Sequence, residues 1–418
     1  MKSTKIVTPL FFFNAASNVI GTAFHSYKFM PKVIYLVAGA RPNFMKIAPI
    51  VRALNAHPTL TYKIIHTGQH YDPEMNAVFF EELGIPQPDF FMGVGGGSHA
   101  QQTARIMVAF EEYCQKTIPD AVLVVGDVNS TLACSIVAKK LQIPVAHVEA
   151  GLRSGDMGMP EEINRLVTDS ISDWFFVTEP SGMHHLQHEG KSDDAIFNVG
   201  HVMVDNLLYQ ADKLSRMDTR NLATTAYKKA QAAAGKRYGV VTLHRPSNVD
   251  DADTFTKISH ALKTIAQELP LIFPVHPRTR QNLEKFAIDL GADITLTGPQ
   301  SYMSFLHLWK DAAVVLTDSG GLQEETTALG VPCITIRENT ERPITVDEGS
   351  NKLAGTDPAT IIHETLDVLR SPQAVCRRPE LWDGKAAERI VAILARVLEN
   401  LSDHGEKTTP KRIQPAKS

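Results

Sequence analysis

The sequence contains little cysteine, and its cysteines form no pattern. Four occur among 418 residues, without the spacing of a zinc site or of a disulfide framework. This scatter argues against a bound metal and favours buried thiols in a reducing compartment. The four residues are Cys114, Cys134, Cys333 and Cys376.

Positive charge is not in excess, and two common nucleotide motifs are missing. With 42 Lys and Arg against 46 Asp and Glu, the net charge is -4, which gives no basic surface for nucleic acid or an anionic membrane. Neither the dinucleotide-binding nor the Walker glycine pattern occurs, so nicotinamide and ATP are not indicated. With 43% hydrophobic and 21% charged residues, the composition is that of a soluble, cytoplasmic globular enzyme.

The length predicts two domains of about 150 to 200 residues each. Both ends differ from this body. Residues 1–30 carry an apolar run that loosely resembles a signal peptide but is interrupted by Asn14 and Ser17, and Met30 is a candidate native start. We expect residues 1–30 and the lysine-rich residues 402–418 to be disordered.

Polar residues follow nearly every strand-like run. The runs alternate with amphipathic segments, as in an α/β protein with doubly wound parallel sheets, which bind ligands at their carboxyl edge. A crossover near Gly200 separates a first set of strands from a second set that resumes at Tyr238, so we expect the site in a cleft between domains. The residues that follow strands include Arg41, Asp127, Glu149, His244, His276 and Asp318.

Three glutamates occur within the stretch from Pro144 to Arg165. Glu149 ends an apolar run, and Pro160 opens a helix that has Glu161 and Glu162 in its first turn. For one of the two helix acids, the simpler interpretation is that it only stabilises the helix terminus. Glu149 lacks this explanation, so the stretch predicts carboxylates that act as acid and base.

A glycine turn predicts a phosphate site. Ser319, Gly320 and Gly321 lie between a strand and a helix, where bare backbone N–H groups and the helix terminus attract an anion. Glu324 and Glu325 would repel phosphate at contact, so at least one must face elsewhere; Glu325 bound to ribose hydroxyls would resolve this conflict. The alternative is a tight turn that only requires small residues.

Cations for the same anion are predicted from two other segments. Arg41 follows a strand, and Lys46 lies about one helical turn further on. Arg342 lies in a loop expected beside the second sheet. Without the glycine turn, all three would be interpreted as solvated surface residues.

Two of the sixteen histidines follow strands of the expected second sheet. They are His244 and His276, and neither has a spacing partner that would indicate zinc. Either could hydrogen-bond a phosphate or a leaving-group oxygen. His244 is the stronger candidate.

Seven motifs occur in one order: GARPNFMK, VGDVNST, HVEAGLRSGD, MPEEINR, TLHR, TDSGGLQEE and TERP. This set resembles the non-hydrolysing UDP-N-acetylglucosamine 2-epimerases, from about Pro31 to Leu401. The resemblance implies the glycosyltransferase-B (GT-B) architecture, in which the last helix crosses back onto the first of two Rossmann-like domains. The implied division is residues 31–199 plus 385–401 for the first domain and residues 200–384 for the UDP-binding second domain.

The resemblance implies a reaction that needs neither metal nor redox cofactor. The family inverts the sugar's second carbon by eliminating UDP to a 2-acetamidoglucal and adding UDP back after protonation from the other face. The implied catalytic residues are Asp127, Glu149, Glu161 and His244. The candidate UDP contacts are Arg41, Lys46, His276, Ser319, Gly320, Gly321, Glu325 and Arg342, and the implied assembly is a homodimer.

Some residues depart from the family pattern. Asn43 stands where many members have an acidic residue, and residues 69–72 differ, after two positions, from the segment that binds a regulatory substrate molecule in the allosteric bacterial group. We therefore expect no substrate activation. The motifs, with GVGGGSHAQQTARIM, also resemble the epimerases of UDP-2,3-diacetamido-2,3-dideoxyglucuronate. Two less favoured functions are those of a GT-B glycosyltransferase and of a non-catalytic nucleotide-sugar-binding protein.

Overall fold

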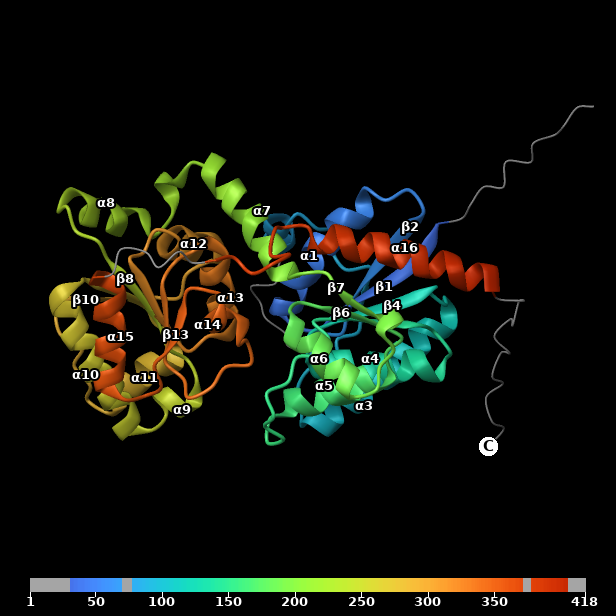
Figure 1. Cartoon of the computed structure of the whole chain (residues 1–418), viewed down its shortest axis with the longest axis horizontal. Coiled ribbons are helices and arrows are strands. Elements are labelled where there is room, and N and C mark those ends of the chain that lie inside the picture. Colours follow the sequence, from blue (N-terminus) through green and yellow to red (C-terminus); the bar gives the residue numbers. More distant parts are fainter. Residues whose placement is uncertain (1–30, 70–76, 371–376, 405–418) are drawn as a thin grey trace, which may run out of the picture. The chain divides into compact units, whose positions relative to one another are not determined.

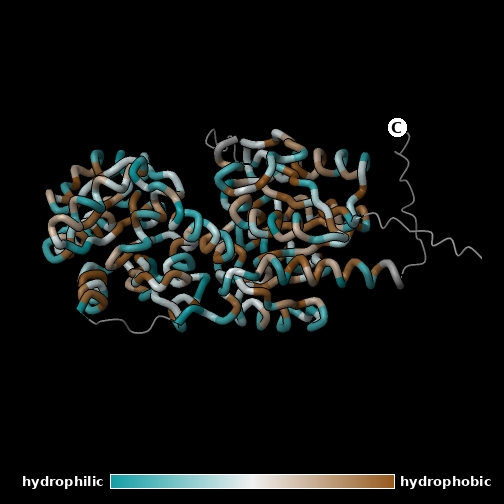
Figure 2. Tube along the Cα trace, turned by 90° about the horizontal axis from the view of Figure 1, so that it is seen from above, coloured by the Kyte–Doolittle hydropathy of each residue, from teal (hydrophilic) through white to brown (hydrophobic). Residues whose placement is uncertain are grey.

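The computed structural model describes residues 31–69, 77–370 and 377–404. Helices and strands alternate along these ranges (Figure 1). In Figure 2, apolar and polar residues alternate along the helical coils, as expected for helices with one face on a core. The expectations for residues 1–30, Cys376 and residues 405–418 lie outside the described residues.

The first sheet has seven parallel strands within the described residues, in the order β3-β2-β1-β4-β5-β6-β7. Strands β2 and β3 are added on one side of β1, and strands β4 to β7 on the other side. The switch point, where doubly wound sheets bind ligands, therefore lies between β1 and β4. The strands are β1 Lys32–Ala38, β2 Leu60–His66, β3 Phe90–Phe91, β4 Ala121–Val125, β5 Val145–Val148, β6 Trp174–Val177 and β7 Ile196–Asn198.

Besides α7, seven of the described helices pack with this sheet, and one of them comes from the far end of the described chain. Helix α16 (red in Figure 1) packs on α1, because Ile390 and Leu394 share a core with Ile47 and Ile50. It ends at His404, three residues beyond the predicted end at Leu401. The helices are α1 Arg41–Asn55, α2 Ala77–Leu83, α3 His99–Lys116, α4 Asn129–Lys140, α5 Pro160–Ile171, α6 Pro180–His188 and α16 Ala386–His404.

The second sheet has six parallel strands within the described residues, in the order β10-β9-β8-β11-β12-β13. Its switch point lies between β8 and β11. The strands are β8 Gly239–Thr242, β9 Leu271–Pro274, β10 Ile294–Thr297, β11 Val314–Thr317, β12 Cys333–Thr335 and β13 Asn351–Leu353. The helices are α8 Thr225–Ala233, α9 Pro246–Val249, α10 Ala252–Glu268, α11 Pro277–Lys285, α12 Tyr302–Trp309, α13 Gly320–Leu329, α14 Ile344–Asp347 and α15 Pro358–Arg370.

Helix α7, Val202–Arg216, contributes to the cores of both sheets. Val202 belongs to the core beneath α1 and α16, whereas Leu207 and Leu214 belong to a core of the second sheet. The two doubly wound parallel sheets confirm the predicted α/β fold class.

Three cysteines are described, and all are free and buried. Burial raises the pKa of Cys114 and of Cys333 to about 12, so these thiols stay protonated at neutral pH. None of the described helices is both long and apolar enough to cross a membrane.

Candidate active site

Glu149 directly follows β5 and is 5% exposed. Its backbone has a φ of 68°, which is uncommon for a residue other than glycine. One carboxylate oxygen, Oε2, forms an ion pair with Lys46. The other, Oε1, is buried and has no hydrogen-bond partner in the described residues. The fold therefore holds a carboxylate with one unused oxygen at the edge of the first sheet.

Lys46 reaches this edge from α1. Burial opposes its charge, but attraction to Glu149 and Asp127 outweighs burial and raises the pKa of Lys46. Gly126 gives the ammonium room, because a Cβ at this residue would lie 2.8 Å from Lys46 Nζ. The other predicted cation of this segment, Arg41, lies over the ring of Phe79, with its Cζ 5.2 Å from the ring centroid. The described contacts thus place Lys46 on the Glu149 carboxylate and Arg41 over the Phe79 ring.

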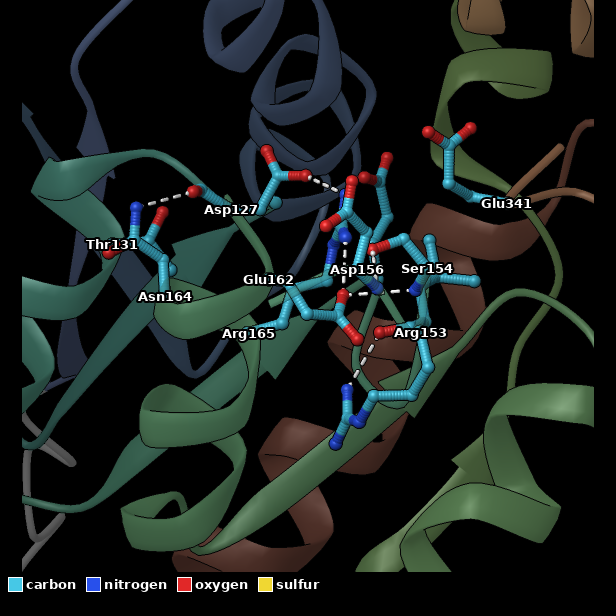
Figure 3. A network of polar contacts seen from close by, with 12 residues as sticks. Asp127, Thr131, Arg153, Ser154, Asp156, Glu162, Asn164, Arg165 and Glu341 are labelled. Carbon is cyan, nitrogen blue, oxygen red and sulfur yellow. Dashed lines mark hydrogen bonds and ion pairs between the residues drawn. The ribbon is translucent and has the colours of Figure 1, made fainter. Parts of the chain in front are cut away.

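Arg165 joins two of the acids (Figure 3). Its NH2 donates to Asp127 Oδ2 at 2.6 Å, and its NH1 donates to Glu162 Oε2 at 2.8 Å. Glu162 also accepts the backbone N–H groups of Ser154 and Gly155, at 3.0 and 3.1 Å. Glu162 therefore fixes the loop before α5, a structural role that differs from the stabilisation of the helix terminus predicted for one of the two helix acids.

Asp127 keeps its negative charge in this environment. Burial disfavours the charge, but Lys46 and Arg165 outweigh it and lower the pKa of Asp127. Asp127 and Glu161 line one cavity of about 280 Å³. Its wall also contains the polar residues Gln69, His99, Gln102, Asn129 and Asn164, together with Gly97, Val128 and Pro160. The structure thus brings Asp127 and Glu161 together at the carboxyl edge of the first sheet.

His244 follows β8 and is held by Asp318, the residue after β11. Its Nδ1 lies 2.9 Å from Asp318 Oδ1, and the Asp318 carboxylate also accepts the backbone N–H groups of His244 and Arg245. Because Asp318 is fully buried and its oxygens accept several donors, it acts as a fixed acceptor for Nδ1–H. The half-exposed His244 ring then presents Nε2 to a ligand.

The predicted phosphate turn opens α13, with Ser319 as its N-cap. Arg342 lies against this turn, because a Cβ at Gly320 would be 2.8 Å from Arg342 NH1. A Cβ at Gly321 would meet nothing within 4 Å. The structure therefore places a guanidinium beside the start of a helix, and both favour an anion.

The two acids that follow this turn are both buried. Glu324 pairs with Arg342, and its Oε1 also lies 2.9 Å from His201 Nε2. Glu325 accepts a hydrogen bond from the Tyr302 hydroxyl at 3.2 Å, and burial raises the pKa of Glu325 to about 7. Both acids thus have partners in the described residues: Glu324 contacts Arg342 and His201, and Glu325 contacts Tyr302.

His276, the other histidine predicted as a site residue, caps a helix. It is exposed at the start of α11, where its Nδ1 accepts the backbone N–H of Arg278 at 3.3 Å. A second sequence feature, Asn43, also has a structural role. Its Oδ1 accepts the N–H groups of Gly39 and Ala40 at the start of α1.

The expectation that the substrate does not activate the protein rests in part on residues 69–72. Of these residues, the structure describes only Gln69. Its Oε1 accepts the N–H and the hydroxyl of Ser130, at 2.8 and 2.6 Å. The remaining positions of this segment lie outside the described residues.

Sequence reasoning missed several residues that hold the candidate site together. Arg165 lies in the motif MPEEINR but was not singled out there, and neither was His201, next to the crossover at Gly200. Glu324 was marked only as a charge that could repel phosphate. Asp318 did carry a signal, because it directly follows an apolar run, but its link to His244 requires β8 and β11 to be neighbours.

The family model described as UDP-N-acetylglucosamine 2-epimerase matches residues 52–395. The chain belongs to this family. Within it, the UDP-N-acetylglucosamine 2-epimerase of Methanocaldococcus jannaschii is 39% identical over 365 residues, covering 86% of this chain and 98% of the relative. The UDP-2,3-diacetamido-2,3-dideoxy-D-glucuronate 2-epimerase of Pseudomonas aeruginosa is 38% identical over 368 residues, covering 87% of this chain and 99% of the relative.

Solved structures of the family have the same fold. The crystal structure of the M. jannaschii UDP-GlcNAc 2-epimerase in complex with UDP-GlcNAc and UDP aligns with a TM-score of 0.76 at 39% identity, covering 87% of this chain and 99% of that chain. The glycosyltransferase of kitacinnamycin aligns with a TM-score of 0.57 at 12% identity, over 88% of this chain and 99% of that one, which shows the fold alone. The predicted GT-B arrangement is confirmed.

Proposed function

We propose that this protein is a UDP-N-acetylglucosamine 2-epimerase, an isomerase that interconverts UDP-GlcNAc and UDP-ManNAc. One observation carries the proposal. The carboxylates at the carboxyl edge of the first sheet interact electrostatically with Arg342, which lies at the phosphate turn of the second sheet. The pKa of Asp127 depends on burial, Lys46 and Arg165, and is also lowered by Arg342. A sugar held at the acids would therefore carry its diphosphate toward the turn.

In this proposal the second sheet binds UDP and the first sheet moves protons. Arg342 and the turn from Ser319 to Gly321 hold the diphosphate, with Arg41 and His276 as further candidate contacts. His244 Nε2 hydrogen-bonds the departing oxygen, and Glu325 binds the ribose hydroxyls. These groups absorb the negative charge that grows as UDP leaves.

Glu149 is the best-supported candidate for the base that removes the proton from the sugar's second carbon. Its Oε2 is held by Lys46, while its Oε1 has no partner among the described residues. Inversion also requires proton delivery on the opposite face, for which Asp127 and Glu161 are the candidates. Each acid or base would contribute about 10² to 10⁴ in rate.

Proton NMR of UDP-GlcNAc incubated with the protein in D₂O tests the function. The expected result is the manno epimer with deuterium at the second carbon. UDP binding without isotope exchange would remove this substrate, and a product that requires an added acceptor would indicate a glycosyltransferase instead.

The second candidate substrate is UDP-2,3-diacetamido-2,3-dideoxyglucuronate. It is favoured by the P. aeruginosa relative, whose identity of 38% is close to the 39% of the M. jannaschii enzyme. The same exchange experiment with both UDP-sugars separates the two, because the preferred substrate will show the higher kcat/KM.

The same proposal includes a cytoplasmic homodimer that serves polysaccharide biosynthesis. It rests on the family to which the chain belongs. Light scattering of the purified protein checks the assembly: a dimer mass is expected, and a monomer mass at micromolar concentration would contradict it.

A further inference from the structure

Glu324 links Arg342 to His201, two residues that lie far apart in the sequence. Its side chain is 4% exposed, and its Oε1 is shared between Arg342 Nε and His201 Nε2. His201 is the N-cap of α7, and Arg342 lies in the loop after β12. One carboxylate oxygen therefore contacts both Arg342, at the phosphate turn, and His201, at the start of α7, the helix that contributes to both cores.

This contact determines which edge of the guanidinium faces a ligand. Glu324 takes Nε, and Glu341 Oε2 lies 3.3 Å from NH1. Within the described residues, no hydrogen bond uses NH2. A guanidinium has five N–H donors in a fixed plane, so fixing Nε also fixes the direction of NH2.

The contact also offsets a local repulsion. Arg342 lies against Gly320 at the start of α13, where the helix dipole is positive. Two positive groups in contact would move apart without a counterion. Glu324 supplies that counterion from the same helix, one turn further along.

A hydrogen bond from the backbone of Met203 fixes the tautomer of His201. Its Nδ1 accepts the N–H of Met203 at 3.1 Å, so the ring proton is on Nε2, which lies 2.9 Å from Glu324 Oε1 without hydrogen-bond geometry. The ring also packs edge-on against Trp382, with centroids 5.2 Å apart. His201 thus approaches Glu324 from a fixed direction.

We propose that Glu324 and His201 are positioning residues that hold Arg342 in place for the diphosphate of a nucleoside diphosphate. The ligand class rests on the proposed function. Neither residue touches the ligand: Glu324 orients Arg342, and His201 orients Glu324.

The first test compares UDP with uridine, which lacks the diphosphate. Glu324→Gln is expected to weaken UDP binding at least tenfold while uridine affinity stays within twofold, measured by calorimetry for UDP and by NMR titration for uridine. His201→Asn preserves the helix cap, because asparagine is a good N-cap residue, but it removes Nε2, and UDP binding should weaken about threefold or more. The matched control is Glu338→Gln, an exposed acid of the same loop that hydrogen-bonds Thr356.

A double-mutant cycle separates positioning from general damage. With Arg342→Gln already present, Glu324→Gln should weaken UDP binding no further, because the group it positions is gone. In turnover, KM for the UDP-sugar should rise by at least the factor seen in UDP binding. A parallel loss of uridine affinity, or additive effects in the cycle, would overturn the positioning role alone. A wild-type protein that does not bind UDP would overturn the proposed function as well.

Discussion

Glu149 and Glu162 are both nearly inaccessible to solvent, yet their oxygens are used differently. Both oxygens of Glu162 accept backbone or guanidinium donors, whereas Oε1 of Glu149 accepts none among the described residues. A buried acceptor without a partner costs about 1 to 3 kcal/mol. A fold that tolerates this cost, with a left-handed backbone at the same residue, supports a functional role for Glu149.

Glu149→Gln should separate binding from turnover. The amide still accepts a hydrogen bond from Lys46 but cannot take a proton from carbon. We expect UDP affinity to stay within about threefold while kcat falls by about 10² to 10⁴, measured by calorimetry and by the deuterium-exchange assay. The exposed Glu268→Gln serves as control, and unchanged turnover in Glu149→Gln would remove this residue from the mechanism.

Glu325 makes stability depend on pH. Burial raises its pKa from 4.5 to about 7, so the folded protein binds this proton more tightly than the unfolded chain. The resulting stabilisation is fully present below pH 4.5 and is lost as pH rises through 7.

Glu325→Gln should remove this dependence. Relative to wild type, the free energy of unfolding of the variant should rise by about 1 to 3 kcal/mol between pH 5 and pH 8. Urea denaturation of both proteins across this range measures the difference. A difference that does not change with pH would show that Glu325 does not titrate in this way.

At the scale of elements, the two parts of the candidate site, around Gly126 in the first sheet and Gly320 in the second, both lie where a strand ends and a helix begins. Gly126, after β4, has a φ of 67° and leaves space that Lys46 Nζ fills. Gly320, at the start of α13, leaves space that Arg342 fills. In both places a missing side chain lets a cation from another element approach the backbone.

Gly126→Ala should displace Lys46. The added Cβ would lie 2.8 Å from Nζ, so we expect kcat/KM to fall about tenfold or more. Gly190→Ala is the matched control, because Gly190 has a similar φ of 79° but no atom within 4 Å of the added Cβ. Both variants bear the left-handed backbone cost of about 1 to 2 kcal/mol. Equal losses of activity would show that the backbone cost, and not Lys46, is responsible.

For the whole molecule, the cores of the two sheets are linked by α7 and by the segment that leads into α16. Asp205 of α7 accepts the backbone N–H groups of Ala386 and Ala387 at the start of α16, at 3.2 and 2.7 Å. Trp382, just before α16, donates its Nε1–H to the Thr178 carbonyl oxygen at 3.2 Å. These contacts fix the return of the chain to the first sheet.

Asp205→Ala leaves two buried N–H groups of α16 without their acceptor. We expect the free energy of unfolding to fall by about 1 to 3 kcal/mol, measured by urea denaturation. Asp212→Ala removes an exposed acid of the same helix that pairs with Arg216, and such surface pairs contribute at most about 1 kcal/mol. A loss no larger than that of the control would show that the cap does not hold α16.

The sequence by itself determined the features that depend on neighbouring residues. Apolar runs that end in Asp127, Glu149 and His244 predicted parallel strands with chemistry at one edge, because side-chain periodicity and turn residues are local properties. Pro160 marked the start of α5 for the same reason. The order of the motifs was enough to indicate the family, which the family model and the relatives confirm.

Only the tertiary structure decided which charges meet. Lys46 was predicted to contact the diphosphate, and the fold gives it Glu149 as a partner, because α1 and β5 are brought to one edge of the sheet although 103 residues separate the two side chains. Glu324 and Glu325 were predicted only as a pair of which at least one must face away from phosphate, and the fold gives Glu324 Arg342 and His201 as partners. A charge loses its water on burial and needs whichever opposite charge the packing supplies, and the sequence pattern does not contain that packing.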